Sequence, residues 1–145
     1  MRKTAHSMVE DAVAAITTYS VEEALDLHGR EDVQFIDIRD VRELERDGVI
    51  PGAFHAPRGM LEFWACLESP YHKPVFADDR HLVLFCAAGW RSALATKTLQ
   101  DMGLPKVAHI GGGFEAWKAA GGPVAAKPPR PGRAAKAAAP PKAKP

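Results

Sequence analysis

The first 124 residues alternate between short apolar runs and amphipathic stretches, which is the pattern of β-strands that alternate with α-helices. The clearest run is 81–85 (HLVLF), and such a run is typical of a strand buried on both faces. Further strands are predicted at 16–18, 33–37 and 106–110, a short extended piece at 54–56, and helices at 8–15, 20–27, 41–46, 60–64, 92–102 and 114–119. This order predicts an α/β domain with a mostly parallel central sheet flanked by helices.

The pattern stops at residue 125. Residues 125–145 consist of eight Ala, six Pro, six Lys or Arg and one Gly. A segment of this composition cannot bury enough apolar surface to offset its ordering entropy, so we expect a disordered basic tail. The predicted organisation is therefore an N-terminal segment with a helix (1–15), one domain (16–124) and the tail (125–145).

Composition and charge exclude several classes of protein. The net charge of +1 hides two unlike parts, because residues 1–124 carry 13 basic and 18 acidic residues and the tail carries six basic ones. Two cysteines argue against a secreted disulfide scaffold. No run approaches the ~18 apolar residues of a membrane span, and acidic residues interrupt any signal-peptide pattern, so a cytoplasmic protein is expected. The tail is predicted to be a solubilising extension. The alternatives are that it folds back on the acidic domain or binds an acidic partner, either a protein or a nucleic acid.

The candidate chemistry is centred on Cys86, which ends the buried run 81–85 and begins a loop that leads into a helix at Ser92. In open α/β sheets, ligands bind just past the carboxyl ends of the strands. Loop amides, the helix dipole and the nearby Arg91 all favour a thiolate over a thiol, and Gly89 gives the loop backbone freedom. The sequence therefore predicts a nucleophilic cysteine, with a small buried hydrophobic residue as the alternative.

The length of this loop separates two chemistries. Protein tyrosine phosphatases place five residues between their cysteine and arginine, whereas four residues separate Cys86 from Arg91. A loop that is one residue shorter encloses less space, so it has less room for a tetrahedral phosphate and suits a single added sulfur on Cys86. A cysteine phosphatase or arsenate-type enzyme is therefore the disfavoured alternative.

Four motifs follow one another along the domain. They are 35–39 (FIDIR) with Glu43 after it, 48–53 (GVIPGA), 86–92 (CAAGWRS), and 112–117 (GGFEAW) closed by 121–124 (GGPV). In this order and spacing they resemble the rhodanese-like family of sulfurtransferases, over about residues 15–124. One departure is Val49, because the family usually has His at this position of the second motif.

The resemblance implies a three-layer sandwich and a two-step sulfur transfer. The Cys86 thiolate takes the sulfane sulfur of a small anionic or persulfide donor, such as thiosulfate, and a thiol or cyanide-type acceptor then removes it. The loop residues expected to surround that sulfur are Ala87, Ala88, Gly89, Trp90, Arg91 and Ser92. No cofactor is implied, and the histidines and cysteines show no metal-ligand spacing. The alternative is a rhodanese-fold binding or regulatory module with little turnover.

Charged residues around the loop are expected to support it. Asp37 ends the strand expected next to the cysteine's strand, and Arg39 and Glu43 come after it. Arg91 either attracts an anionic donor or braces the loop through a carboxylate, and Asp37 is the expected partner. The other interpretation of Asp37 is a cap on the helix that follows it.

Several further residues can be interpreted either as functional or as purely structural. Trp90 is expected at the apolar rim of the pocket rather than in the core. Arg58 is either a second anion contact or, more in keeping with its type, a solvated surface arginine. Cys66 is expected to be a structural thiol rather than a resolving cysteine for a disulfide. The glycines 111–113 lack the lysine and the spacing of a P-loop, so they predict a tight turn.

Overall fold

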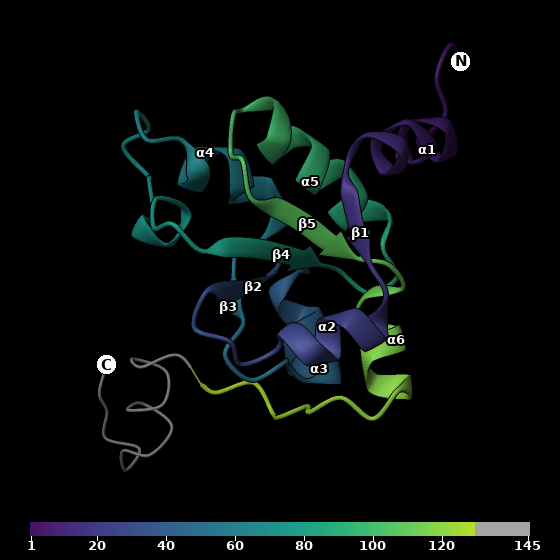
Figure 1. Ribbon diagram of the computed structural model, residues 1–145, viewed down its shortest axis with the longest axis vertical. Coiled ribbons are helices and arrows are strands. Elements are labelled where there is room, and N and C mark those ends of the chain that lie inside the picture. The colour runs from purple at the N-terminus through teal and green to yellow at the C-terminus, as the bar shows by residue number, and fades with distance from the viewer. Residues whose placement is uncertain (130–145) are drawn as a thin grey trace, which may run out of the picture.

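Five parallel strands form the central sheet of the structure, a computed structural model that describes residues 1–129 (Figure 1). The strands are β1 (Thr17–Tyr19), β2 (Val33–Asp37), β3 (Phe54–His55), β4 (His81–Phe85) and β5 (Val107–Ile110). The α-helices are α1 (Ala5–Ala15), α2 (Val21–Leu27), α3 (Val41–Asp47), α4 (Leu61–Ala65), α5 (Trp90–Asp101) and α6 (Gly113–Ala119), and the 3-10 helices are η1 (Arg58–Met60) and η2 (Pro74–Phe76). The order across the sheet is β1-β5-β4-β2-β3, which confirms the predicted α/β architecture.

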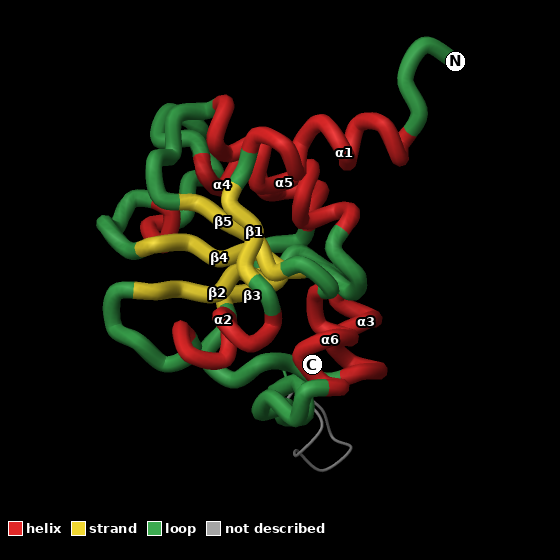
Figure 2. The backbone as a smooth tube through the Cα atoms, turned by 45° about the vertical axis from the view of Figure 1, so that its right-hand side comes forward, coloured by secondary structure: helices red, strands yellow, loops and turns green. Residues whose placement is uncertain are grey.

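Side-chain alternation along β4 produces the three layers. Leu82 and Leu84 point into a core that includes residues of α4 and α5, whereas Val83 and Phe85 pack on the other face with Trp117 of α6. Helices α1, α4 and α5 lie on one side of the sheet, and α2, α3 and α6 lie on the other (Figures 1 and 2). Both faces of a parallel sheet are therefore covered, and the carboxyl ends of β2, β4 and β5 share one edge.

Two helices begin two or three residues earlier than the sequence predicts. Helix α1 begins at Ala5 because Thr4 accepts a hydrogen bond from the Ser7 amide, at 3.0 Å, and caps the first turn. Helix α5 begins at Trp90 rather than Ser92, because Gly89 takes up a left-handed conformation with φ of +116° and serves as the N-cap. The loop after β4 is therefore short, and part of the predicted loop is the first turn of a helix.

The two ends of the chain extend the sandwich in different ways. Helix α1 packs Val9 and Ala12 against Ala93 of α5, whereas Ala125 pairs with Val49 through backbone hydrogen bonds of 2.8 and 2.9 Å. Contact with the domain thus extends one residue beyond the predicted boundary at 124. The predicted disorder of the tail falls mostly on residues 130–145, which lie outside the described residues, and the three-part division of the chain stays a prediction.

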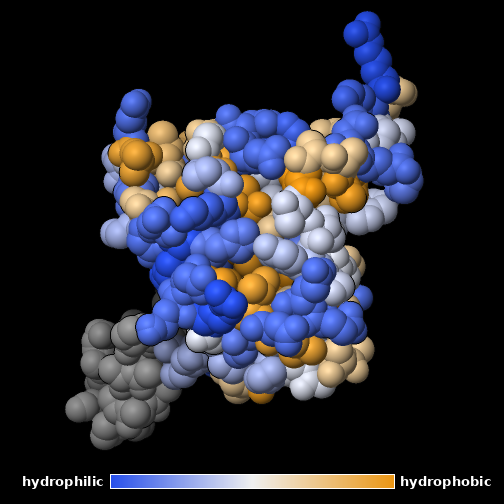
Figure 3. Space-filling view, viewed as in Figure 1, coloured by the Kyte–Doolittle hydropathy of each residue, from blue (hydrophilic) through white to orange (hydrophobic). Residues whose placement is uncertain are grey.

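The surface is mixed in character. Polar side chains cover most of the face shown in Figure 3, with small apolar patches between them. Within residues 1–129, no helix combines the length and the hydropathy that crossing a bilayer requires.

Candidate active site

The Cys86 side chain lies at the carboxyl edge of the sheet, directly after β4. It continues the alternation of Leu82 and Leu84, so it belongs to the core layer beneath α5, and the residue is only 1% exposed. Its Sγ accepts hydrogen bonds from the backbone N–H groups of Gly89, at 3.2 Å, and Ser92, at 3.4 Å. Two convergent N–H donors stabilise a negative charge on this sulfur.

Helix α5 begins beside the cysteine, and the backbone of its first turn carries unpaired N–H groups. Its first intrahelical bond runs from the N–H of Ala93 to the carbonyl of Gly89, at 3.1 Å. The N–H groups of Trp90 and Arg91, in the first turn, therefore have no intrahelical acceptor, and the positive end of the helix dipole lies beside the cysteine. The nest expected from the sequence is built from this helix start together with Gly89.

Helix α6 holds the loop from the opposite side. The N–H groups of Phe114 and Glu115 donate to the carbonyls of Cys86 and Ala87, at 2.8 and 3.0 Å. These carbonyls are thereby held away from the sulfur, which leaves the N–H groups to face it. The approach requires a glycine at 113, because a Cβ there would overlap the carbonyl of Cys86. The glycine run forms the predicted tight turn, and its close contact with the cysteine loop is the feature that sequence reasoning missed.

Arg91 is held by a carboxylate, as one of its two interpretations requires, but the partner is Glu43 and not Asp37. The guanidinium donates from Nη1 and Nη2 to the two oxygens of Glu43, at 2.8 and 3.0 Å. This contact lowers the pKa of the Glu43 carboxyl and raises the pKa of the Arg91 guanidinium. The pair ties α3 to the first turn of α5 and so fixes the loop between β4 and α5.

Asp37 has a different partner from the one that the sequence suggested. It forms a buried ion pair with Arg39, with an Nη2–Oδ2 distance of 2.7 Å. Arg39 also donates to the carbonyl of Gly48, at 2.9 Å, and its guanidinium lies 4.1 Å from the ring centroid of Phe114. The capping interpretation of Asp37 is also wrong, because Asp40 caps α3. The pair therefore joins the end of β2 to the second motif and to α6.

Two further residues named from the sequence lie on the surface. Trp90 is 54% exposed and lies beside the His6 ring of α1, with ring centroids 5.8 Å apart. Arg58 pairs with Glu62, at 2.8 Å, and lines a pocket of about 280 Å³ together with Lys97 and residues of α1. Trp90 thus lies outside the core, and Arg58 is a partly solvated, paired arginine.

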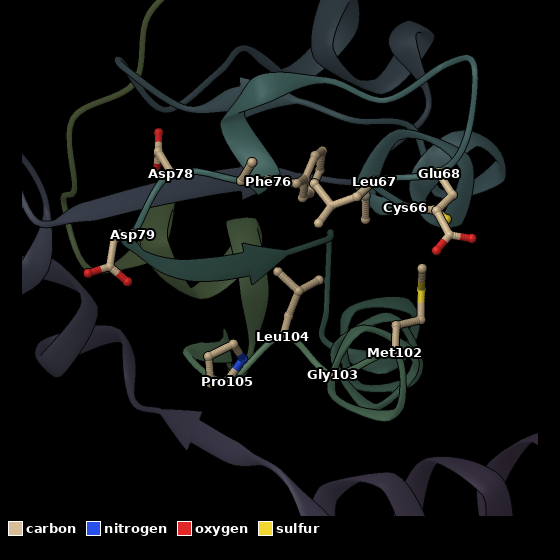
Figure 4. Close-up of a pocket in the computed structure, with 12 residues that line it drawn as sticks. Cys66, Leu67, Glu68, Phe76, Asp78, Asp79, Met102, Gly103, Leu104 and Pro105 are labelled. Atoms are coloured by element: carbon tan, nitrogen blue, oxygen red, sulfur yellow. The ribbon is translucent and has the colours of Figure 1, made fainter.

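Cys66 lies far from the candidate nucleophile. It lines a cavity of about 520 Å³ with Asp79 and Pro105 (Figure 4), and these two residues precede β4 and β5. Cys86 follows the opposite end of β4, a five-residue strand that spans roughly 16 Å. A disulfide needs Cα atoms within about 7 Å, so this fold keeps the two free thiols apart.

One polar residue of the site was missed by the sequence analysis. His109 on β5 is 2% exposed, and its Nδ1 lies 2.9 Å from the hydroxyl of Ser92. Its Nε2 lies 3.0 Å from the hydroxyl of Thr18 on β1. Burial lowers the pKa of His109 to about 4, so the ring is neutral at neutral pH. The available signal was a single histidine in an otherwise apolar strand, at a position that faces α5.

Comparison with known proteins settles the family. The Rhodanese-like domain family matches residues 20–120. The chain belongs to this family. Its five-stranded parallel sheet and its cysteine after β4 agree with the resemblance carried by the four motifs.

Relatives of this rhodanese-like domain differ in how they are described. A sulfurtransferase of Allochromatium vinosum is 32% identical over 66% of this chain and 81% of its own length. Thiosulfate sulfurtransferase GlpE of Pseudoalteromonas translucida is 30% identical over 70% of this chain and 88% of its own. A solved structure from Rhodopseudomonas palustris, described as a protein of unknown function and possible tyrosine phosphatase, is 53% identical with a TM-score of 0.84, covering 86% of this chain and 96% of its own.

Proposed function

We propose that this protein is a sulfurtransferase in which Cys86 carries a sulfane sulfur as a persulfide between a donor and a thiophilic acceptor. The observation that carries the proposal is the sulfur of Cys86 at the centre of a short loop, with the N–H groups of Gly89 and Ser92 pointing at it. The sulfurtransferase relatives support the same chemistry. A reducing cytoplasm, as expected from the sequence, keeps such a thiol available.

The first step loads the enzyme. The Cys86 thiolate attacks the outer sulfur of thiosulfate, a new S–S bond forms, and the donor's S–S bond breaks as sulfite leaves with the electron pair. The N–H groups of Trp90 and Arg91 have no intrahelical acceptor and are available as donors to the added sulfur. Fixed donors of this kind stabilise developing charge, by roughly 2.7–4 kcal/mol each in other enzymes.

The second step unloads the sulfur. A cyanide ion or a thiolate attacks the outer sulfur of the persulfide, and the Cys86 thiolate leaves with the electrons of the broken S–S bond. Gly89 and Ser92 hold their N–H groups at 3.2 and 3.4 Å from Sγ, so the leaving thiolate is stabilised without reorganisation of the loop. Loading therefore relies on the N–H groups of Trp90 and Arg91 at the outer sulfur, and release relies on those of Gly89 and Ser92 at Sγ.

Positive groups at the loop attract an anionic donor, whereas the net charge of the whole domain does not. The domain before the tail carries a net charge of −5, which repels anions. Arg91 is positioned by Glu43 at the loop, and its side chain is 42% exposed. With the helix dipole, it is the local source of positive potential. A persulfide donor needs less of this attraction than thiosulfate does, so both donor classes belong in the test.

The test compares sulfur transfer with phosphate hydrolysis in one enzyme. We expect turnover of thiosulfate or a persulfide with cyanide or a thiol as acceptor, and no turnover by Cys86→Ala. Hydrolysis of an aryl phosphate is expected to be absent, because the loop between Cys86 and Arg91 is short. Phosphate hydrolysis that is lost in Cys86→Ala, with no sulfur transfer from any donor, would replace the proposal with a phosphatase. Absence of both activities in the folded protein would favour a binding module.

A further inference from the structure

A chain of hydrogen bonds runs from the buried cysteine to the surface. The Cys86 thiol lies 3.6 Å from the hydroxyl of Ser92, which lies 2.9 Å from Nδ1 of His109. On the far side of the ring, Nε2 of His109 lies 3.0 Å from the hydroxyl of Thr18. Cys86 is almost completely buried, whereas Thr18 is exposed on the edge strand β1. The chain therefore joins a buried ionisable group to solvent.

Among residues 1–129, the ring of His109 has these two hydrogen-bond partners. On β4 it pairs in register with the apolar Leu84, and on α5 the neighbouring Thr96 hydroxyl is directed to a backbone carbonyl. Burial is the cause of the shift in the pKa of His109, with no charged group contributing. Cys86 is the titratable group to which hydrogen bonds connect this ring, through Ser92.

Because the ring is neutral, it carries one proton, on either Nδ1 or Nε2. With the proton on Nε2, His109 donates to Thr18, and the Ser92 hydroxyl donates to Nδ1. Ser92 then accepts from the Cys86 thiol. With the proton on Nδ1, His109 donates to Ser92 instead. The Ser92 hydroxyl, which also lies 3.3 Å from the carbonyl of Gly89, is then released from Nδ1 and can donate to the charged Cys86 thiolate, the stronger acceptor, while Thr18 donates to Nε2. Each tautomer fits one protonation state of the cysteine.

We propose that His109 is a positioning residue that relays the Cys86 proton to solvent by changing its tautomer. The proton of the thiol passes to Ser92 Oγ, the former Ser92 proton passes to Nδ1, the Nε2 proton passes to Thr18, and the former Thr18 proton passes to hydroxide or a buffer base. One proton leaves the cysteine and one reaches solvent, and every group between gains and loses one. The result is a thiolate with the Ser92 hydroxyl as a third donor, beside the two amides. The role rests on the proposed function, in which Cys86 must ionise before it attacks a donor.

The direct test is nitrogen-15 NMR of the imidazole of His109 across a pH titration. The ultraviolet absorbance of the thiolate records the ionisation of Cys86 in the same samples. The pattern of the two ring nitrogens is expected to change from the Nε2–H to the Nδ1–H tautomer at the pH where the thiolate forms. This change is expected to disappear in Cys86→Ser and to lose its link to the thiolate in Ser92→Ala. A ring that keeps one tautomer, or becomes doubly protonated, while the thiolate forms would overturn the proposal.

Two substitutions separate the hydrogen bond from position 109 to Ser92 from simple packing, whereas the change of tautomer tests the relay itself. His109→Phe keeps most of the volume but removes both hydrogen bonds, so the pH of half-ionisation of Cys86 is expected to rise by about one unit. His109→Asn leaves a cavity, but its amide reaches the position of Nδ1 and can donate to Ser92, so the midpoint is expected to stay near that of the wild type. The reverse order, with Phe harmless and Asn harmful, would contradict the role. These measurements need no sulfur donor, so they remain decisive even if sulfur transfer is not found.

Discussion

At the scale of single residues, the site depends on two carboxylates that have separate tasks. Asp37 neutralises the buried Arg39, whereas Glu43 holds the half-exposed Arg91. The first pair lies in the core and supports the fold, and the second lies at the loop and positions the helix start beside the cysteine. Because the two pairs differ in burial, replacing each carboxylate by a neutral residue is expected to change the stability of the domain by different amounts.

Replacing Asp37 is expected to destabilise the domain strongly. Asp37→Asn leaves the guanidinium of Arg39 buried without a counter-charge, which typically costs about 3–5 kcal/mol. Urea denaturation measures this loss. The matched control is Asp32→Asn, which removes the partner of Arg30 in an exposed pair, and no measurable change is expected there. Equal effects of the two substitutions would show that burial of the Asp37 pair is unimportant.

Replacing Glu43 is expected to lower the free energy of unfolding by an amount that depends on pH. The contact with Arg91 lowers the pKa of Glu43 from its ordinary value of 4.5. Its contribution to stability is therefore complete above that value and is lost as the pH falls through the lower folded-state pKa. We expect Glu43→Gln to cost about 1 kcal/mol at pH 7, since half of the pair is exposed. Denaturation midpoints between about pH 7 and 3 should converge for the two proteins, and a difference that is constant with pH would argue against this pair.

The sequence predicts the nucleophile and the nearby arginine because strand ends follow directly from apolar patterning. It does not predict which carboxylate reaches Arg91. Asp37 lies nearer the strand end, yet its side chain turns into the core, and the first turn of α3 carries Glu43 to the loop. His109 was missed for a similar reason. A lone histidine in a strand has no spacing to mark it, and its partners come from residues 17 and 91 positions away.

At the scale of elements, the loop after β4 is held between two helix starts. Helix α5 directs N–H groups at the sulfur, and α6 binds the loop carbonyls. Apolar periodicity predicted nearly every element, because both faces of the sheet are buried. It did not predict the starts of α1 and α5, which depend on a Thr4–Ser7 capping box and on the left-handed Gly89 rather than on apolar spacing.

The contact between α6 and the loop can be tested with a pair of glycines. Gly113→Ala is expected to displace the loop, because the new Cβ would overlap the backbone at Cys86, and to abolish sulfur loading. Gly121→Ala also has a positive φ but meets nothing within 4 Å, so it should cost only about 1–2 kcal/mol and leave loading unchanged. Loading rates and urea midpoints of both variants check this. Comparable loading by the two would contradict the role of α6.

At the scale of the whole molecule, the near-neutral charge conceals an acidic domain and a basic tail. Positive potential for an anionic donor therefore comes from Arg91 and the start of α5 rather than from the domain as a whole. The segment after α6 makes contacts that its composition did not predict. Pro123 accepts a hydrogen bond from the indole of Trp117, at 2.8 Å, and Ala125 pairs with Val49.

Truncation separates the tail from these contacts. Ending the chain after Ala125 removes all six basic residues of the tail and is expected to leave both stability and sulfur loading of Cys86 unchanged. Ending it after Gly122 also removes the contacts of Pro123 and Ala125, and is expected to lower the denaturation midpoint. A large loss of loading in the longer truncation would show that the tail takes part in the reaction.

The central claim is that Cys86 accepts a single sulfur atom, and intact-protein mass spectrometry tests it most directly. After incubation with thiosulfate, polysulfide or a persulfide donor, the protein is expected to gain the mass of one sulfur atom. Cyanide or a thiol should remove this mass, and Cys86→Ser should never gain it. A folded wild-type protein that gains no sulfur from any of these donors, or a Cys86→Ser variant that still gains it, would contradict the account.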